Sequence, residues 1–97
     1  HITGGGFYEN IPRCIPHGLC AKICKASLRT PAIFGLLQKQ GGIDEHDMFN
    51  TFNMGVGMIV VVSPETADAA LSALKAEGID AYVCGEIVPG EDQVVLV

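Results

Sequence analysis

The sequence contains few positive charges and no long apolar stretch. Lysine and arginine together number six, they are scattered along the chain, and the formal net charge is −5. Because no basic stripe is present to neutralise a phosphate backbone, nucleic-acid binding is not expected. The longest apolar run, Met58–Val62, is far too short to cross a bilayer, and no targeting segment is visible. We therefore expect a cytoplasmic protein that binds neither nucleic acid nor membrane.

The sequence also lacks a Cys-x-x-Cys pair, which argues against a zinc site. Its four cysteines, at positions 14, 20, 24 and 84, would suit two disulfides in a secreted protein. Nothing indicates secretion, so we expect reduced thiols that pack as small hydrophobes. Cys20 and Cys24 are four residues apart, which places them on one side of a strand or a helix and suits a core face as well as a ligand pair.

Apolar side chains are abundant. Hydrophobic residues make up 48% of the 97 residues and the mean hydropathy is +0.35, which excludes intrinsic disorder. Charged residues reach only 18%, and the length suits one domain or part of one. Either the core is rich in small apolar residues or some apolar surface meets a partner. We expect the isolated chain to self-associate or to expose a large apolar patch.

The first half of the chain predicts one strand and two helices. Small and apolar residues favour a strand over Leu19–Leu28. Thr30 is expected to cap, and Pro31 to begin, a helix with Ile33, Phe34 and Leu37 on its apolar side, which stops at Gly41–Gly42. A second, short helix is expected after Asp44. Its apolar side would carry Met48, Phe49 and Phe52.

The acidic segment Asp44–Asp47 has two interpretations. Asp44 suits a helix cap, with Asp47 reaching back to it as a carboxylate variant of the capping box, and acids are favoured at this end of a helix. A metal cluster formed by the same segment, which includes His46, is the weaker alternative. We expect His46 and His17 to lie at the surface.

The second half predicts three strands and a helix. The β-branched run Met58–Val62 is typical of a central strand buried on both faces. A helix should cover residues 63–78, closed by its last glycine. Strands over 81–88 and 93–97 should pair antiparallel through a type II turn at Pro89–Gly90. The resulting order, β-α-α-β-α-β-β, predicts an α/β fold with a two-layer mixed sheet and helices on one face.

Two glycine loops, one near the start of the chain and one before Met58, are the strongest signs of a ligand site. Successive backbone N–H groups in such loops can surround an anion, although neither loop carries the Walker or the full Rossmann pattern. A turn without a ligand remains an alternative for the second loop. Arg13 either clamps a phosphate or pairs with Glu9, and His1 is suited to move a proton near neutral pH. The candidate binding residues lie in or beside these loops: Gly4, Gly5, Gly6, Asn10, Arg13, Asn53, Gly55 and Gly57.

Two longer segments carry a family resemblance. Residues 1–13, HITGGGFYENIPR, and residues 48–58, MFNTFNMGVGM, resemble two stretches of the phosphoribosylformylglycinamidine cyclo-ligase (AIR synthase) family. The resemblance covers the whole chain. It implies that residues 1–97 are the C-terminal portion of the family's second domain, a fragment that lacks the N-terminal ATP-binding domain.

The resemblance also implies an activity. The family's enzyme uses ATP and Mg²⁺ to convert formylglycinamidine ribonucleotide to aminoimidazole ribonucleotide in de novo purine biosynthesis, and it works as a homodimer. By the same resemblance His1 borders the active site as the candidate catalytic residue, while Asn10, Arg13 and Asn53 bind substrate or shape the loops. ATP and Mg²⁺ would be bound mainly by the absent domain. The fragment is therefore expected to hold no cofactor or metal and to be inactive alone.

Other functions stay open at this point. A small non-catalytic α/β module that binds a ligand or pairs with its own copy would explain the element order equally well. A sister enzyme with the same two-domain plan is a third possibility, such as formylglycinamidine synthase, selenophosphate synthetase or thiamine-phosphate kinase.

Overall fold

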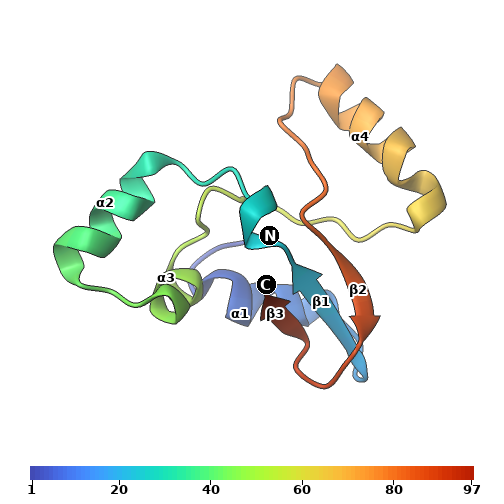
Figure 1. Cartoon of the computed structure of the whole chain (residues 1–97). Coiled ribbons are helices and arrows are strands. Elements are labelled where there is room, and N and C mark those ends of the chain that lie inside the picture. Colours follow the sequence, from blue (N-terminus) through green and yellow to red (C-terminus); the bar gives the residue numbers. More distant parts are fainter.

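The computed structural model describes residues 1–97 and places a small three-stranded sheet beside two short helices (Figure 1). The helices are α1 (Gly6–Asn10), α2 (Ala32–Gly41), α3 (Glu45–Thr51) and α4 (Ala67–Ala76). The strands are β1 (Leu19–Ile23), β2 (Gly85–Pro89) and β3 (Val94–Leu96), and single 3-10 turns occupy Ile11–Cys14, Lys25–Ser27 and Pro64–Thr66. The predicted α/β class with a mixed sheet is confirmed. The predicted element order is wrong, because α1 occurs where a loop was expected and one predicted strand does not form.

The strands lie in the order β2-β1-β3. β1 pairs antiparallel with β2, with Ile23 opposite Gly85, and parallel with β3, with Ala21 opposite Val94. The predicted hairpin between the last two strands is therefore wrong, since β3 lies on the far side of β1 from β2. The type II turn is also absent: Gly90 does not have the positive φ that such a turn requires, whereas Gln93 has a φ of 60°. Between β2 and β3 the chain crosses the end of the middle strand, β1.

The predicted central strand at Met58–Val62 is wrong. The segment is irregular, and the side chains of Met58 and Val60 are 65% and 62% exposed. β-branched residues favour extended backbone, but a strand also needs a neighbouring ladder of hydrogen bonds, and this segment pairs with none of the three strands. The local strand preference of Met58–Val62 is therefore not enough to form a strand, because the segment has no pairing partner.

Glycine determines the end of α2. Gly42 adopts the left-handed conformation at a φ of 60°, and the N–H of Ile43 donates to the carbonyl of Gln38 over 3.1 Å. The predicted stop at Gly41–Gly42 is confirmed. The predicted start is off by one residue: Pro31 occupies the capping position and Ala32 begins the helix, so Thr30 lies outside it and its side chain makes no capping hydrogen bond.

The start of α3 and the end of α4 follow the sequence closely, whereas α4 begins at Ala67, after a 3-10 turn, and not at residue 63. The carboxylate of Asp44 accepts a 2.8 Å hydrogen bond from the N–H of Asp47, which confirms Asp44 as the cap of α3. The reciprocal bond from Asp47 to the N–H of Asp44 is not formed. Gly78, with a φ of 75°, follows α4 and closes it as predicted.

The core lies between α1, α3 and one face of the sheet. The rings of Phe7 and Phe49 meet edge to face, with 5.1 Å between their centres, and Met48 is fully buried beside them. The prediction that Met48, Phe49 and Phe52 form the apolar side of α3 is confirmed, with Phe52 half-buried. The remaining buried members of the cluster come from the chain start, the 3-10 turn, the sheet and the loop after α3: Ile2, Ile11, Ile15, Ala21, Ile23, Met54 and Val94.

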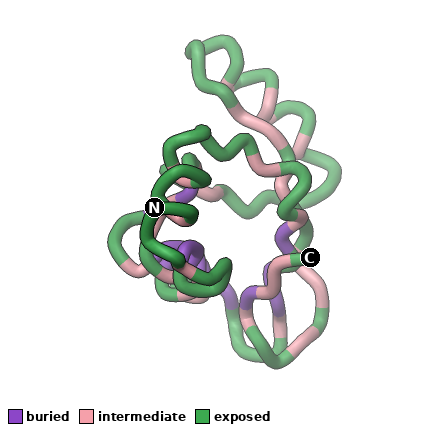
Figure 2. Tube along the Cα trace, turned by 60° about the vertical axis from the view of Figure 1, so that its left-hand side comes forward, coloured by how far each residue is buried: buried purple, intermediate pink, exposed green.

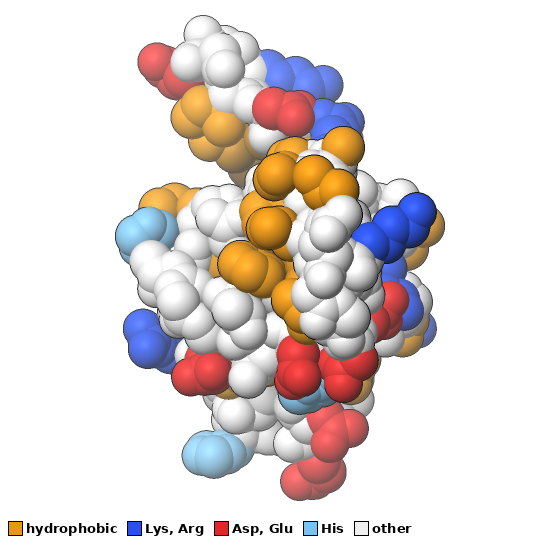
Figure 3. Space-filling view, turned by 90° about the vertical axis from the view of Figure 1, so that its left-hand side faces the viewer, with side chains coloured by type: hydrophobic (Ala, Val, Ile, Leu, Met, Phe, Trp, Pro, Cys, Tyr) orange, Lys and Arg blue, Asp and Glu red, His pale blue; other side chains and the backbone are white.

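Helices α2 and α4 project away from this core (Figure 1) and contain no buried residue (Figure 2). Of the three residues predicted on the apolar side of α2, Ile33 and Leu37 are 52% and 39% exposed, and Phe34 is half-buried against the core cluster. The prediction of helices packed over one face of the sheet therefore fails for α2 and α4, since only α1 and α3 supply buried side chains. From the side of the molecule that carries α2, Figure 3 shows apolar side chains gathered at the surface. No helix combines the length and apolarity needed to cross a membrane.

Two methionines test this description of the core. Met48→Ala should lower the free energy of unfolding by about 2–5 kcal/mol, because the substitution empties a fully buried volume. Met58→Ala, at an exposed position, should change it by less than about 0.5 kcal/mol. Urea denaturation followed by circular dichroism measures both. Equal losses would show that residues 58–62 form a buried strand after all.

Candidate functional site

The first glycine loop has a backbone that only glycine permits. Gly5 and Gly6 have φ values of 99° and 61°. A Cβ on Gly6 would lie 2.1 Å from the carbonyl oxygen of Phe49, inside any allowed contact. The start of α1 is therefore pressed directly against the end of α3, and the loop is held in one position.

Asn10 fixes the same loop from within. It is 6% exposed, and its side-chain amide donates to the carbonyl of Gly6 over 2.8 Å and to those of Thr3 and Gly4 over 3.3 Å. The Thr3 hydroxyl donates to its Oδ1 over 3.3 Å. The Asn10 side chain is therefore committed to the loop's own backbone. In contrast, the N–H groups of Gly4 and Gly5 donate to no acceptor within the chain.

The second glycine loop is ordered by Asn53. Its Oδ1 accepts a 2.9 Å hydrogen bond from the N–H of Gly55, and the intervening Met54 takes a left-handed φ of 54°. A Cβ on Gly55 would lie 2.4 Å from the Cδ of Pro31, so the loop also packs closely against the start of α2. Asn53 Oδ1 is thereby occupied, while its NH₂ group makes no hydrogen bond within the chain.

The two glycine loops meet. The N–H of Ile2 donates to the carbonyl of Gly57 over 2.8 Å, joining the segments that precede the first loop and close the second. Beside this bond lies a hollow of about 450 Å³ that brings Gly4 and Asn53 to one site. Its lining consists of Ile2, Thr3, Gly4, Phe34, Thr51, Phe52 and Asn53.

The other predicted site residues do not line this hollow. Gly5, Gly6, Gly55 and Gly57 lie in the loop backbones, and Asn10 lies beneath the first loop. The exposed His1 directly precedes Ile2 in the chain. Thus the structure brings the two loops together and leaves His1 beside the hollow.

Arg13 lies elsewhere, exposed in the 3-10 turn after α1. It forms no ion pair, so the pairing with Glu9 that the sequence left open does not occur. His17 and His46 are exposed as predicted, and the ring of His46 stacks on that of Tyr8.

Five lining residues were not among the predicted site residues: Ile2, Thr3, Phe34, Thr51 and Phe52. Thr3 and Thr51 lie within the segments that carry the family resemblance, and the Thr3 hydroxyl donates to Asn10. Phe34 comes from α2 and contacts Phe52, with 5.8 Å between ring centres. Nothing in the local sequence indicated this contact, because it depends on how α2 is placed against α3.

The hollow contains no charged side chain and no metal-binding group. No three His, Cys, Asp or Glu side chains in the chain lie close enough together to hold a metal ion. In the segment Asp44–Asp47, the Asp44 carboxylate is used as a helix cap. The site therefore offers neutral donors, namely the backbone N–H of Gly4 and the side-chain NH₂ of Asn53, which suit the oxygen atoms of an anionic or sugar-like ligand.

Comparison with known proteins gives a consistent family assignment. The family model described as "AIR synthase related protein, C-terminal domain" matches residues 1–97. A protein named phosphoribosylformylglycinamidine cyclo-ligase from Caldicellulosiruptor bescii is 53% identical over 96 residues, which is 99% of this chain and 28% of that relative. A protein of the same name from Thermoanaerobacter sp. strain X514 is 52% identical over 99% of this chain and 29% of that relative. Another from Staphylococcus carnosus is 49% identical over 99% of this chain and 28% of that relative.

These matches extend far beyond the two segments that first suggested the resemblance. The chain spans less than a third of the length of these relatives, and the match nevertheless covers almost every residue of the chain itself. The chain therefore belongs to the AIR synthase related family, and it matches the family's C-terminal domain.

Proposed function

We propose that this chain is the C-terminal portion of a phosphoribosylformylglycinamidine cyclo-ligase, a cytoplasmic enzyme of de novo purine biosynthesis. The intact enzyme would convert formylglycinamidine ribonucleotide and ATP to aminoimidazole ribonucleotide, ADP and phosphate. The observation that carries the proposal is the meeting of the two glycine loops at one hollow, in a chain about half identical to relatives of that name. An isolated ligand-binding module would not require this likeness along the whole chain.

The chemistry explains why such a hollow is useful. Transfer of the terminal phosphoryl group of ATP to the substrate's amide oxygen turns a poor leaving group into phosphate. The amidine nitrogen then attacks that carbon, a ring closes, phosphate departs and the nitrogen loses a proton. Both ligands are anionic and must be held in line, so catalysis depends mainly on positioning and on donors aimed at oxygen atoms.

In this proposal the chain's neutral donors bind the substrate. The N–H groups of Gly4 and Gly5 and the NH₂ group of Asn53 are without acceptors in the chain and face ligand oxygens. Gly6 and Gly55 allow the close backbone contacts that fix the two loops, Gly57 closes the second loop by accepting from the N–H of Ile2, and Asn10 holds the first loop in shape. His1 takes the proton released on ring closure. Arg13, free of an ion pair, reaches a phosphate group from outside the hollow.

The remaining requirements are met outside these 97 residues. As the family resemblance implies, ATP and Mg²⁺ would be bound mainly by an N-terminal domain. The magnesium ion would neutralise charge on the transferred phosphoryl group. The exposed apolar faces of α2 and of residues 58–62 support contacts with that domain and with the second subunit of a homodimer (Figure 3).

The isolated chain and the intact protein should therefore behave differently. The intact protein should form aminoimidazole ribonucleotide and ADP from formylglycinamidine ribonucleotide and ATP. The 97-residue chain should give no turnover and should sediment as a self-associated species. Turnover with selenide or thiamine phosphate instead would assign a sister enzyme, and turnover by a monomeric 97-residue chain would contradict the proposal.

His1→Ala in the intact enzyme should lower kcat by about 100-fold, as is typical when a proton-transfer group is removed. The melting temperature should stay unchanged, since His1 is exposed and its side chain makes no hydrogen bond within the chain. His17→Ala, at another exposed histidine, is the matched control and should leave kcat unaltered. Steady-state kinetics with thermal melting distinguishes the two, and an unchanged kcat in the first variant would remove His1 from the reaction.

Asn10→Asp should destabilise the chain by about 1–3 kcal/mol, because the new carboxylate cannot donate to the three loop carbonyls. Burial beside carbonyl oxygens should raise the pKa of the introduced carboxyl in the folded state. The loss should therefore be small at low pH and grow as pH rises above the unfolded value of about 3.9.

The matched control is Asn50→Asp, at a half-buried amide that makes no hydrogen bond within the chain. Urea denaturation at several pH values measures the difference between the two variants. Parallel pH dependences would contradict the role of Asn10 as the internal brace of the first loop.

A further inference from the structure

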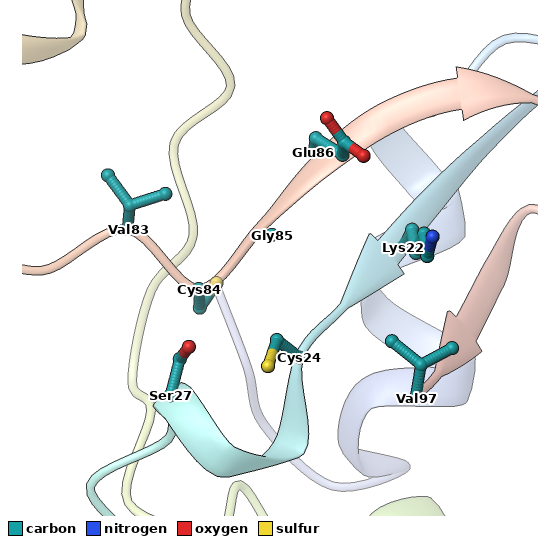
Figure 4. A pocket seen from close by; sticks show the side chains of 8 residues that line it. All are labelled: Lys22, Cys24, Ser27, Val83, Cys84, Gly85, Glu86 and Val97. Carbon is teal, nitrogen blue, oxygen red and sulfur yellow. The ribbon is translucent and has the colours of Figure 1, made fainter.

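A second hollow, of about 290 Å³, lies at the end of the sheet where β1 ends and β2 begins. The site residues discussed above do not line it. Two of the chain's four cysteines, Cys24 and Cys84, do, together with Lys22, Ser27 and Glu86 (Figure 4). All four cysteines are free thiols, with Cys14 exposed, Cys20 buried, and Cys24 and Cys84 half-buried.

The strand register places Cys24 and Cys84 directly opposite each other. Ile23 is paired with Gly85 in the antiparallel ladder, and the next step of that register joins residues 24 and 84. The N–H of Cys24 donates to the carbonyl of Cys84 over 2.8 Å, and Cys24 has an extended backbone, so the ladder continues to this pair. Opposite residues of an antiparallel pair have Cα atoms roughly 4.5–5.5 Å apart and side chains on the same face. That spacing lies within the range a disulfide spans.

We propose that Cys24 and Cys84 form a reactive thiol pair that exchanges with small disulfides of the glutathione type and closes reversibly to a Cys24–Cys84 disulfide. Neither of the other two cysteines has this arrangement. Cys20 is opposite Val88 in the ladder, and the Sγ of Cys14 donates to the carbonyl of Ile11 in its own 3-10 turn.

The two thiols differ in pKa, and this difference sets the order in which they react. The Ser27 hydroxyl, followed by the Ser27 backbone N–H, lowers the pKa of the Cys24 thiol. Burial raises the pKa of the Cys84 thiol. Lys22 and Glu86, which are opposite each other in the ladder, line the same hollow. Cys24 is therefore the first thiol to react and Cys84 the second.

The exchange balances without a further reactant. The Cys24 thiolate attacks one sulfur of glutathione disulfide, forming a mixed disulfide and releasing one glutathione thiolate. The Cys84 thiol then loses its proton and attacks the Cys24 sulfur, which releases the second glutathione. Two protein thiols lose two electrons and two protons, and one glutathione disulfide becomes two glutathione thiols.

The product would join β1 to β2 around a long stretch of chain. The closed loop contains α2, α3 and α4, including the two helices whose residues are not buried. Cross-linking a long loop restricts the unfolded chain, so the oxidised form should melt at a higher temperature than the reduced form.

The test is a redox titration of the 97-residue chain in mixtures of reduced and oxidised glutathione, followed by alkylation and peptide mass spectrometry. The expected product is a Cys24–Cys84 linked peptide that forms and disappears reversibly with the glutathione ratio. Cys84→Ser should stop at a glutathione adduct on Cys24. Cys14→Ser and Cys20→Ser, the matched controls, should still form the linkage.

Two further measurements test the thiol pair even if one of the cysteine variants does not fold. Phenylarsine oxide, which needs two adjacent thiols, should protect Cys24 and Cys84 of the unaltered chain from alkylation. Ser27→Ala should shift the pH midpoint of Cys24 alkylation upward. The proposal would be overturned if the Cys24–Cys84 linkage did not form under oxidising glutathione or formed only in denaturant. It would also be overturned if phenylarsine oxide left the two thiols open to alkylation. Because none of these measurements involves the glycine loops, their failure would leave the proposed enzymatic function untouched.

Discussion

The contact between Gly6 and the carbonyl of Phe49 sets the geometry of the rest of the site. It brings the backbone of α1 against the end of α3 at a distance that no side chain at position 6 would allow. The same contact directs Phe7 onto Phe49 in the centre of the core and starts the loop that Asn10 holds from below. Because the segment after α3 continues into the second glycine loop, fixing this end of α3 also brings the two loops together.

Features that depend on neighbours in the sequence were predictable. The stop of α2, the cap of α3 and the close of α4 each follow from one residue, Gly42, Asp44 or Gly78, acting on its own turn. The glycine loops were also visible as loops, and their residues Gly4 and Asn53 do line the hollow. In these cases the physical cause lies within a few residues of its effect, so the sequence displays both.

Features that depend on distant partners were not predictable. The β-branched run Met58–Val62 has strong local preference for a strand, yet pairing requires an available neighbour that no residue in the run specifies. The parallel pairing of β3 with β1 similarly depends on the chain crossing β1 after β2, which the short segment between β2 and β3 gave no reason to expect. The helix α1 was missed for the opposite reason. The run of three glycines that leads into it suggested a loop, but the cost of ordering this segment is offset by Phe7, which only the fold shows to be buried.

The uncharged lining of the hollow indicates which part of catalysis this chain performs in the proposed enzyme. Phosphoryl transfer develops negative charge that must be met by cations, and the hollow is lined only by uncharged groups in a chain whose net charge is −5. Rigid backbone donors are suited to a different task, which is to orient oxygen atoms without attracting every anion nearby. In the proposed enzyme, the hollow with its neutral donors would form one side of the active site. The positive charge would come from the ATP-binding domain on the opposite side. In the proposed enzyme the glycine loops therefore contribute alignment of the substrate, and the energy of charge neutralisation comes from the ATP-binding side.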